Sequence, residues 1–123
     1  MGWRNWSVDD NLLIMTTKLA VISPLQLKKK FEDKEKFILF DVREPEEFEV
    51  CHIYGAILVP LSEIQDHLPD FNVNSEYVVV CKKGDRSKNA IDIMKKNGFS
   101  NLLNLEGGII NWAKSVERTM ELY

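Results

Sequence analysis

Short apolar runs alternate with amphipathic segments along most of the chain. The apolar runs predict strands at residues 18–22, 37–40, 56–59, 77–80 and 102–105. Between the runs, apolar positions recur with helical spacing and predict helices from Ser23-Pro24 onward and at residues 45–50, 62–67, 87–97 and 109–116. Strands that alternate with helices predict an α/β fold, in which helices flank a mostly parallel central sheet.

The run Tyr77–Val80 gives the clearest strand, because it is rich in β-branched residues and unbroken by polar ones. Such a run is typical of a parallel strand that helices cover on both faces. In open α/β sheets, ligands bind just beyond the carboxyl ends of the strands. Cys81 follows this strand, and Asp41 follows another. We therefore expect both residues at the functional edge of the sheet.

Composition limits the class of protein. The chain has 123 residues, 45% of them hydrophobic, which is enough for one domain with its own core. We expect this domain at residues 18–123 and an arm of unknown role at residues 1–17. A net charge of −3 does not indicate binding to nucleic acid or to a membrane, and no apolar run approaches the roughly 20 residues of a membrane span. Two cysteines do not suggest a secreted disulfide framework, which favours a cytoplasmic location.

The segment after the strand 77–80 carries the candidate chemistry. The candidate nucleophile is Cys81, and the helix predicted from residue 87 lies shortly after it. The loop between them contains Lys82, Lys83, Gly84, Asp85 and Arg86. The loop amides, the helix N-terminus and three cations stabilise negative charge, and so favour a nucleophilic thiolate, a persulfide or a small oxyanion. The alternative is a buried structural cysteine beside an exposed basic turn.

Two separated motifs resemble those of the rhodanese-like domains. The first is DVREPEEF at residues 41–48, which continues to HIYGA at residues 52–56. The second is CKKGDRS at residues 81–87. The segment LEGG at residues 105–108, with Trp112 after it, resembles the closing segment of the family. The likeness covers residues 18–123 in order and spacing, and it implies the three-layer rhodanese-like fold.

The resemblance implies a sulfurtransferase. Cys81 would take the outer sulfur of thiosulfate or of a protein persulfide, hold it as a persulfide, and pass it to a thiophilic acceptor. Arg86, Lys82 and Lys83 would orient an anionic donor. Lys82 stands where thiosulfate-using members often carry arginine, so the charge is kept but the bidentate guanidinium is lost. The resemblance implies no metal and no organic cofactor.

The length of the loop separates sulfur transfer from a related chemistry. Phosphatases and arsenate reductases of related folds need five residues between the cysteine and the arginine, so that the loop fits a tetrahedral oxyanion. Here four residues separate Cys81 from Arg86. The shorter loop favours a site for one added sulfur atom over a site for a phosphate ester.

Other residues near the two motifs have both a functional and a structural interpretation. Asp41 and Arg43 are expected to support the site by holding the fold together through an ion pair that could include Glu47. By resemblance, His52 is a structural turn residue rather than a general base. Cys51 stands where the family usually has glycine, and we interpret it as a small, partly buried residue, with a resolving thiol as the alternative.

The end of the chain indicates a kind of partner. The Gly107-Gly108 turn, Trp112 and the terminal Tyr123 resemble the C-terminal sulfurtransferase domain of ubiquitin-activating-like adenylyltransferases. Because those proteins pass sulfur to small sulfur-carrier proteins, the resemblance implies such a carrier or another thiol as the acceptor. A non-enzymatic binding or regulatory module is the alternative from another class. The presence of Cys81 argues against it, because inactive members often lose this cysteine.

Overall fold

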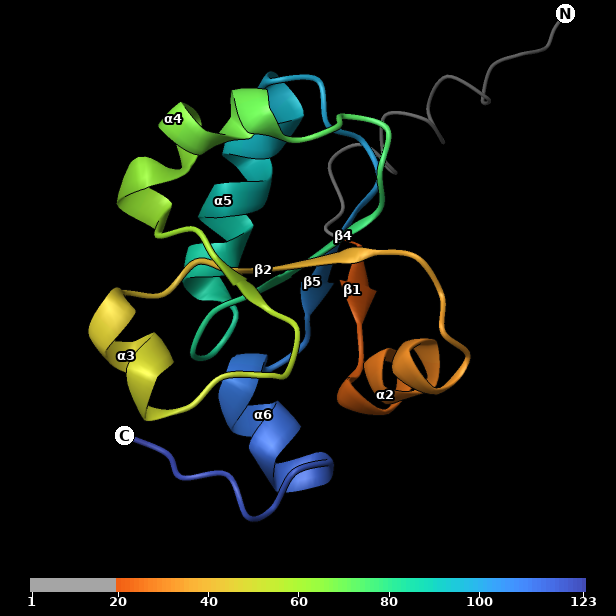
Figure 1. Cartoon of the computed structure of the whole chain (residues 1–123), viewed down its shortest axis with the longest axis vertical. Helices are drawn as coiled ribbons and strands as arrows, with labels where there is room; N and C mark the ends of the chain where they lie inside the picture. The colour runs from red at the N-terminus through yellow and green to blue at the C-terminus, as the bar shows by residue number, and fades with distance from the viewer. Residues whose placement is uncertain (1–19) are drawn as a thin grey trace, which may run out of the picture.

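A five-stranded parallel sheet forms the centre of the computed structural model, which describes residues 20–123 (Figure 1). The strands are β1 (Val21–Ile22), β2 (Ile38–Asp41), β3 (Ile57–Leu58), β4 (Tyr77–Val80) and β5 (Leu102–Leu105). They lie in the order β1-β5-β4-β2-β3, and every pairing is parallel. The predicted α/β fold with a parallel sheet is therefore confirmed, and the ends of β2 and β4 lie side by side.

Alternate residues of β4 face two separate hydrophobic clusters. Tyr77 and Val79 belong to the cluster on one face of the sheet, and Val78 and Val80 belong to the cluster on the other. All four residues are at most 1% exposed. A strand that is buried on both faces needs an apolar residue at every position, which explains the unbroken apolar run.

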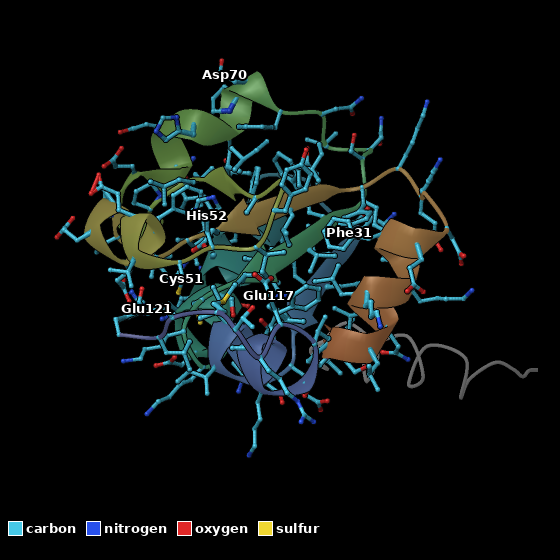
Figure 2. All side chains as sticks on the ribbon, turned by 60° about the horizontal axis from the view of Figure 1, so that its bottom comes forward. Phe31, Cys51, His52, Asp70, Glu117 and Glu121 are labelled. Atoms are coloured by element: carbon cyan, nitrogen blue, oxygen red, sulfur yellow. The ribbon has the colours of Figure 1, made fainter. Side chains whose placement is uncertain are left out.

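Helices cover both faces of the sheet (Figures 1 and 2). One face is covered by two helices and two 3-10 turns, which are α4 (Ile64–His67), α5 (Asp85–Lys96), η1 (Leu61–Glu63) and η2 (Leu68–Asp70). The other face is covered by α2 (Pro24–Glu32) and α6 (Gly108–Ser115). There, Phe31 of α2 packs edge-on against Trp112 of α6. Within residues 20–123, no helix is both long and apolar enough to cross a membrane.

The amino-terminal end of the sheet begins with a short strand and a capped helix. β1 comprises Val21–Ile22, whereas the sequence predicted a strand over residues 18–22. Its first two predicted residues and the predicted arm at residues 1–17 lie outside the described part of the chain. Ser23 caps α2 as predicted, because its Oγ accepts a hydrogen bond from the amide of Gln26 at 3.1 Å.

The helix after β4 begins earlier than the sequence predicted. α5 starts at Asp85 rather than at Ser87. Gly84 just before it has a φ of +116°, a conformation that favours glycine, and it ends the loop there. Asp85 is also favoured in the first turn of a helix, where its charge meets the positive end of the helix dipole. Arg86 therefore belongs to the first turn of α5 and not to the loop.

Candidate active site

Cys81 lies at the carboxyl end of β4, in the turn that leads into α5. Its side chain is buried, with 0% of the residue exposed. The turn is short because the left-handed backbone of Gly84 reverses the chain within three residues of the cysteine. A buried thiol is thereby held where a parallel sheet and a helix N-terminus meet, which is the place that the sequence predicted for it.

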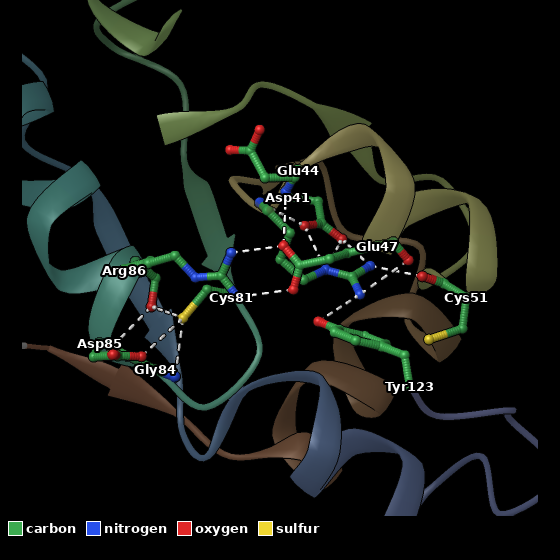
Figure 3. A network of polar contacts seen from close by, with 11 residues as sticks. Asp41, Glu44, Glu47, Cys51, Cys81, Gly84, Asp85, Arg86 and Tyr123 are labelled. Atoms are coloured by element: carbon green, nitrogen blue, oxygen red, sulfur yellow. Dashed lines mark hydrogen bonds and ion pairs between the residues drawn. The ribbon is translucent and has the colours of Figure 1, made fainter. Parts of the chain in front are cut away.

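Three groups surround the sulfur of Cys81 (Figure 3). The backbone N–H of Gly84 donates a hydrogen bond to Sγ at 3.0 Å. Ser87 Oγ lies 3.4 Å from Sγ, and Asp85 Oδ1 lies 3.9 Å from it. The two donors can stabilise a negatively charged sulfur, whereas the carboxylate of Asp85 repels one. Of the loop amides expected to point at the sulfur, Gly84 provides the hydrogen bond that the structure records.

Ser87 and Asn104 connect this turn to the neighbouring strand β5. Ser87 Oγ lies 3.0 Å from the carbonyl oxygen of Gly84 and within hydrogen-bonding distance of Asn104 Oδ1. Asn104 Nδ2 donates to the same carbonyl oxygen at 3.2 Å. Both side chains are buried. Because a hydroxyl carries one proton, Ser87 donates to one of its neighbours at a time, and it can turn towards the sulfur when the sulfur is charged.

The first turn of α6 holds the loop that follows Cys81 through two backbone hydrogen bonds. The amide of Ile109 donates to the carbonyl of Cys81 at 2.9 Å, and the amide of Ile110 donates to the carbonyl of Lys82 at 3.2 Å. Gly108 makes this approach possible, because a Cβ there would lie 2.3 Å from the carbonyl oxygen of Lys82. Since trans peptides point their C=O and N–H groups in opposite directions, these contacts turn the amides of Lys82 and Lys83 away from α6.

Arg86 is paired with a carboxylate from α3 (Pro45–Val50). Its two terminal nitrogens lie 2.6 and 3.0 Å from the two carboxylate oxygens of Glu47. The hydrogen bonds from Arg86 hold the pKa of Glu47 at about 2, so Glu47 is charged at any physiological pH. The sequence suggested Glu47 as a partner of Arg43 instead. That suggestion was wrong for the carboxylate, because Arg43 contacts only the backbone oxygen of Glu47, at 3.4 Å.

Asp41 and Arg43 form a buried ion pair beside the site. Arg43 Nη2 and Asp41 Oδ2 are 2.7 Å apart, and both residues are at most 1% exposed. Burial works against the charge of Arg43, but the hydrogen bonds to Asp41 and Tyr123 outweigh it and raise the pKa of Arg43. Arg43 also donates to the carbonyl of Cys51 at 2.6 Å and to the hydroxyl of Tyr123 at 3.1 Å. The pair thus supports the surroundings of the loop without a recorded contact to the sulfur.

The two lysines of the turn differ in their surroundings. Lys82 Nζ lies 4.5 Å from the centre of the ring of Tyr123, a distance typical of a cation–π contact. Lys83 is exposed. Neither lysine forms an ion pair with a residue of the described part of the chain. Both amines therefore lack a carboxylate partner among the described residues, while Arg86 and Arg43 are bound to carboxylates.

Comparison with known proteins places this geometry in a family. Residues 23–115 match the family described as Rhodanese-like domain. The chain belongs to this family. The motif CKKGDRS, which begins with Cys81, runs from the end of β4 into the first turn of α5 in this rhodanese-like domain.

Relatives and solved structures agree with the assignment. The chain is 38% identical over 108 residues to "Probable adenylyltransferase/sulfurtransferase MoeZ" of Mycobacterium tuberculosis, which covers 86% of the chain but 28% of MoeZ. It is 35% identical over 95 residues to "Putative sulfurtransferase YtwF" of Bacillus subtilis, over 77% of the chain and 91% of YtwF. The crystal structure of a rhodanese-like domain protein from Staphylococcus aureus superposes with a TM-score of 0.74 at 31% identity, and covers 85% of this chain and 99% of that one. The chain therefore spans little more than a quarter of the length of MoeZ.

Residues outside the turn have structural contacts. His52 stacks on the ring of Phe48, with centroids 3.9 Å apart, and its Nδ1 lies 2.9 Å from the carbonyl of Phe48. Trp112 is buried in the core. Cys51 and Cys81 are both free thiols, and Figure 3 shows their sulfur atoms on opposite sides of the polar network. Within residues 20–123, no three His, Cys, Asp or Glu side chains gather where they could hold a metal ion.

Sequence reasoning did not assign a role to Ser87, Asn104 or Tyr123. Asn104 had a usable signal, because it is a polar residue within the otherwise apolar strand Leu102–Leu105. A buried polar residue needs a hydrogen-bond partner, and such a residue near the end of a strand is a candidate for the functional site. Tyr123 had no such signal, since its contact with Arg43 joins residues that are 80 positions apart.

Proposed function

We propose that this rhodanese-like domain is a sulfurtransferase that carries sulfur as a persulfide on Cys81. The observation that carries the proposal is the hydrogen bond of 3.0 Å from the backbone N–H of Gly84 to the sulfur. A backbone donor stabilises a charged sulfur without a change of protonation of its own. The family match and the relatives named as sulfurtransferases support sulfur transfer in general.

The proposed reaction has two half-steps. The Cys81 thiolate attacks the outer sulfur of thiosulfate, the S–S bond of the donor breaks, and sulfite leaves with the electron pair of that bond. A persulfide donor reacts in the same way and leaves as a thiolate. In the second half-step, an acceptor thiolate attacks the outer sulfur on Cys81, which returns as a thiolate. No net oxidation occurs, and no metal or organic cofactor is needed.

The proposed site residues divide into three roles. Cys81 is the catalytic residue. The loop residues Lys82, Lys83 and Gly84 and the first α5 residues Asp85 and Arg86 surround the transferred sulfur, and Asp41 with Arg43 supports the surroundings of the loop. The pairing of Arg86 with Glu47 favours sulfur transfer over phosphate-ester hydrolysis, because it withdraws the guanidinium that would hold a phosphate. The presence of Cys81 in a formed turn disfavours a purely regulatory module.

The sulfur donor and the sulfur acceptor are also proposed rather than observed. Thiosulfate and a protein persulfide are the candidate donors. A small sulfur-carrier protein or another thiol is the candidate acceptor, because MoeZ is named as both an adenylyltransferase and a sulfurtransferase. A relative that is 36% identical over 101 residues is named "Putative sulfur carrier protein YrkF" and supports a carrier as the acceptor.

Mass spectrometry of the intact protein tests the proposal. We expect incubation with thiosulfate, or with a protein that bears a persulfide, to add one sulfur atom, and we expect cyanide to remove it as thiocyanate. Cys81→Ser should abolish the adduct. Cys51→Ser is the matched control, because it removes the other buried free thiol and should leave the adduct in place. Absence of an adduct with every donor would contradict the proposed function.

A further inference from the structure

An acidic side chain lies beside the proposed sulfur-carrying atom. Asp85 is the first residue of α5, and its Oδ1 lies 3.9 Å from Sγ of Cys81. The residue is exposed, whereas Cys81 is fully buried. The carboxylate of Asp85 therefore contacts both the solvent and the buried sulfur (Figure 3).

Asp85 shares a surface pocket with Lys83 and Lys88 but forms an ion pair with neither. Asp85 forms no ion pair within residues 20–123. Arg86, the next residue, binds Glu47 through both terminal nitrogens, and its positive charge also interacts with Cys81 (Figure 3). Lys82 points its amine at the ring of Tyr123. Among the hydrogen-bond contacts recorded for the sulfur within residues 20–123, the one charged group is therefore the carboxylate of Asp85.

We propose that Asp85 is a specificity-determining residue that selects sulfur donors of low negative charge. The preferred class is a persulfide, whose sulfur carries at most one negative charge, and the disfavoured donor is the thiosulfate dianion. This inference rests on the proposed sulfur transfer to Cys81. It differs from the simple expectation that the cations of the turn attract anionic donors.

The physical reason is that Coulomb repulsion grows in proportion to the charge of the donor. A unit charge about 4 Å from a carboxylate in watery surroundings loses a factor of about 5 in binding, and a doubly charged donor loses about the square of that, roughly 25-fold. Glu47 contributes to the same preference, because it offsets part of the attraction that Arg86 exerts on an anion.

Two small sulfur donors that react in the same way but differ in charge isolate the repulsion by Asp85 from other effects of a substitution. Thiosulfate is a dianion and releases sulfite. Methanethiosulfonate is a monoanion and releases methanesulfinate, and both give the same persulfide on Cys81. We expect Asp85→Asn to raise the rate of Cys81 loading about fivefold with methanethiosulfonate and about 25-fold with thiosulfate. Asp85→Ser should reproduce this result, and Asp85→Glu should retain the wild-type preference.

Asp92→Asn is the matched control, since Asp92 is exposed and lies on the same helix, two turns from Asp85. It makes the same change in net charge and should leave the ratio of the two loading rates unchanged. Equal gains with the two donors, or no gain, in Asp85→Asn and Asp85→Ser would overturn the inference while sulfur transfer stands. If neither donor nor a protein persulfide loads the wild-type protein, the proposed function fails, and this inference fails with it.

Discussion

The hydroxyl group of Ser87 joins the sulfur of Cys81 to the rest of the molecule. It lies 3.4 Å from Sγ, 3.0 Å from the carbonyl oxygen of Gly84, and next to Asn104 of β5. A buried hydroxyl with three polar neighbours fixes the shape of a turn more firmly than backbone contacts alone. The turn therefore depends on one atom that is not itself a nucleophile.

Ser87→Ala should weaken both the turn and its reactivity. Loss of the hydroxyl leaves Asn104 and the sulfur each short of a partner, which costs about 1–3 kcal/mol of unfolding free energy. We expect the rate of persulfide formation on Cys81 to fall roughly tenfold, since one hydrogen bond to a charged sulfur is lost. Urea unfolding and mass spectrometry with thiosulfate measure the two effects. Ser115→Ala is the control, because the hydroxyl of Ser115 bonds Asn111 on the exposed side of α6; an equal effect in both variants would contradict this role of Ser87.

Glu47 should make the stability of the fold depend on acidity. Its pKa is lowered from 4.5 to about 2 by the hydrogen bonds from Arg86. The carboxylate therefore stabilises the folded state above about pH 4.5, and this contribution is lost as the pH falls towards 2. We expect wild-type protein to lose about 1–3 kcal/mol more than Glu47→Gln between pH 6 and pH 3. Urea unfolding at both pH values measures this difference.

Glu49→Gln provides the reference for that titration. Glu49 is an exposed residue of the same helix, α3, and has no recorded ion pair within residues 20–123. Its replacement makes the same change in net charge. Parallel pH profiles of the wild type, Glu47→Gln and Glu49→Gln would show that the pair with Arg86 does not stabilise the fold.

The position of Cys81 between β4 and α5 could be predicted from the sequence, but the partners of the charged groups could not. Cys81 was recognisable because a strand, a turn and a helix follow one another within a few residues. The pairing of Arg86 with Glu47 joins residues 39 positions apart, and depends on how α3 and α5 approach each other. Local sequence patterns contain no information about that distance. The sequence therefore could not predict which cations of the site are paired with carboxylates.

Helix α6 holds the loop through its first turn, and Gly108 is the residue that permits this contact. Gly108→Ala would place a Cβ 2.3 Å from Lys82 O and 2.6 Å from Cys81 O, which is closer than these atoms can approach. We expect a loss of about 3 kcal/mol or more in unfolding free energy, and loss of persulfide formation in the protein that remains folded. Thermal unfolding and mass spectrometry after incubation with thiosulfate provide the two measurements.

Gly55→Ala separates backbone strain from the clash. Gly55 also has a positive φ, of +86°, but a Cβ there would meet no atom within 4 Å. It should cost only about 1 kcal/mol, from the left-handed backbone alone, and should leave Cys81 loading unchanged. Similar losses at the two glycines would mean that the contact between α6 and the loop is unimportant.

Strands and helices were predicted well where a local signal sets their ends. β4 and β5 were predicted with the bounds that the structure has, because apolar runs mark them. The start of α5 was wrong by two residues, because Ser87 was interpreted as the first residue of the helix. Its hydroxyl instead bonds Gly84 and Asn104 inside the structure. Serine favours the starts of helices, but the side chain of Ser87 makes tertiary contacts instead, and no local pattern reveals such contacts.

Arg43 connects three distant parts of the molecule. Its guanidinium binds Asp41 at the end of β2, the carbonyl of Cys51 after α3, and the hydroxyl of Tyr123. Burial raises the pKa of Tyr123, so its hydroxyl stays protonated at neutral pH. The segment that follows α6 is thereby attached to the side of the sheet where β2 ends. This connection also positions the ring of Tyr123 under the amine of Lys82.

Tyr123→Phe tests this connection, because it removes the hydroxyl and retains the ring. We expect the unfolding free energy to fall by about 1–2 kcal/mol, since a hydrogen bond to a charged, buried group is lost. The urea dependence of unfolding should be unchanged, because the buried area is nearly the same. Tyr54→Phe is the control, as Tyr54 is 90% exposed and should lose nothing measurable. If the two variants unfold at the same urea concentration, the hydrogen bond between Arg43 and Tyr123 does not hold the end of the chain to the sheet.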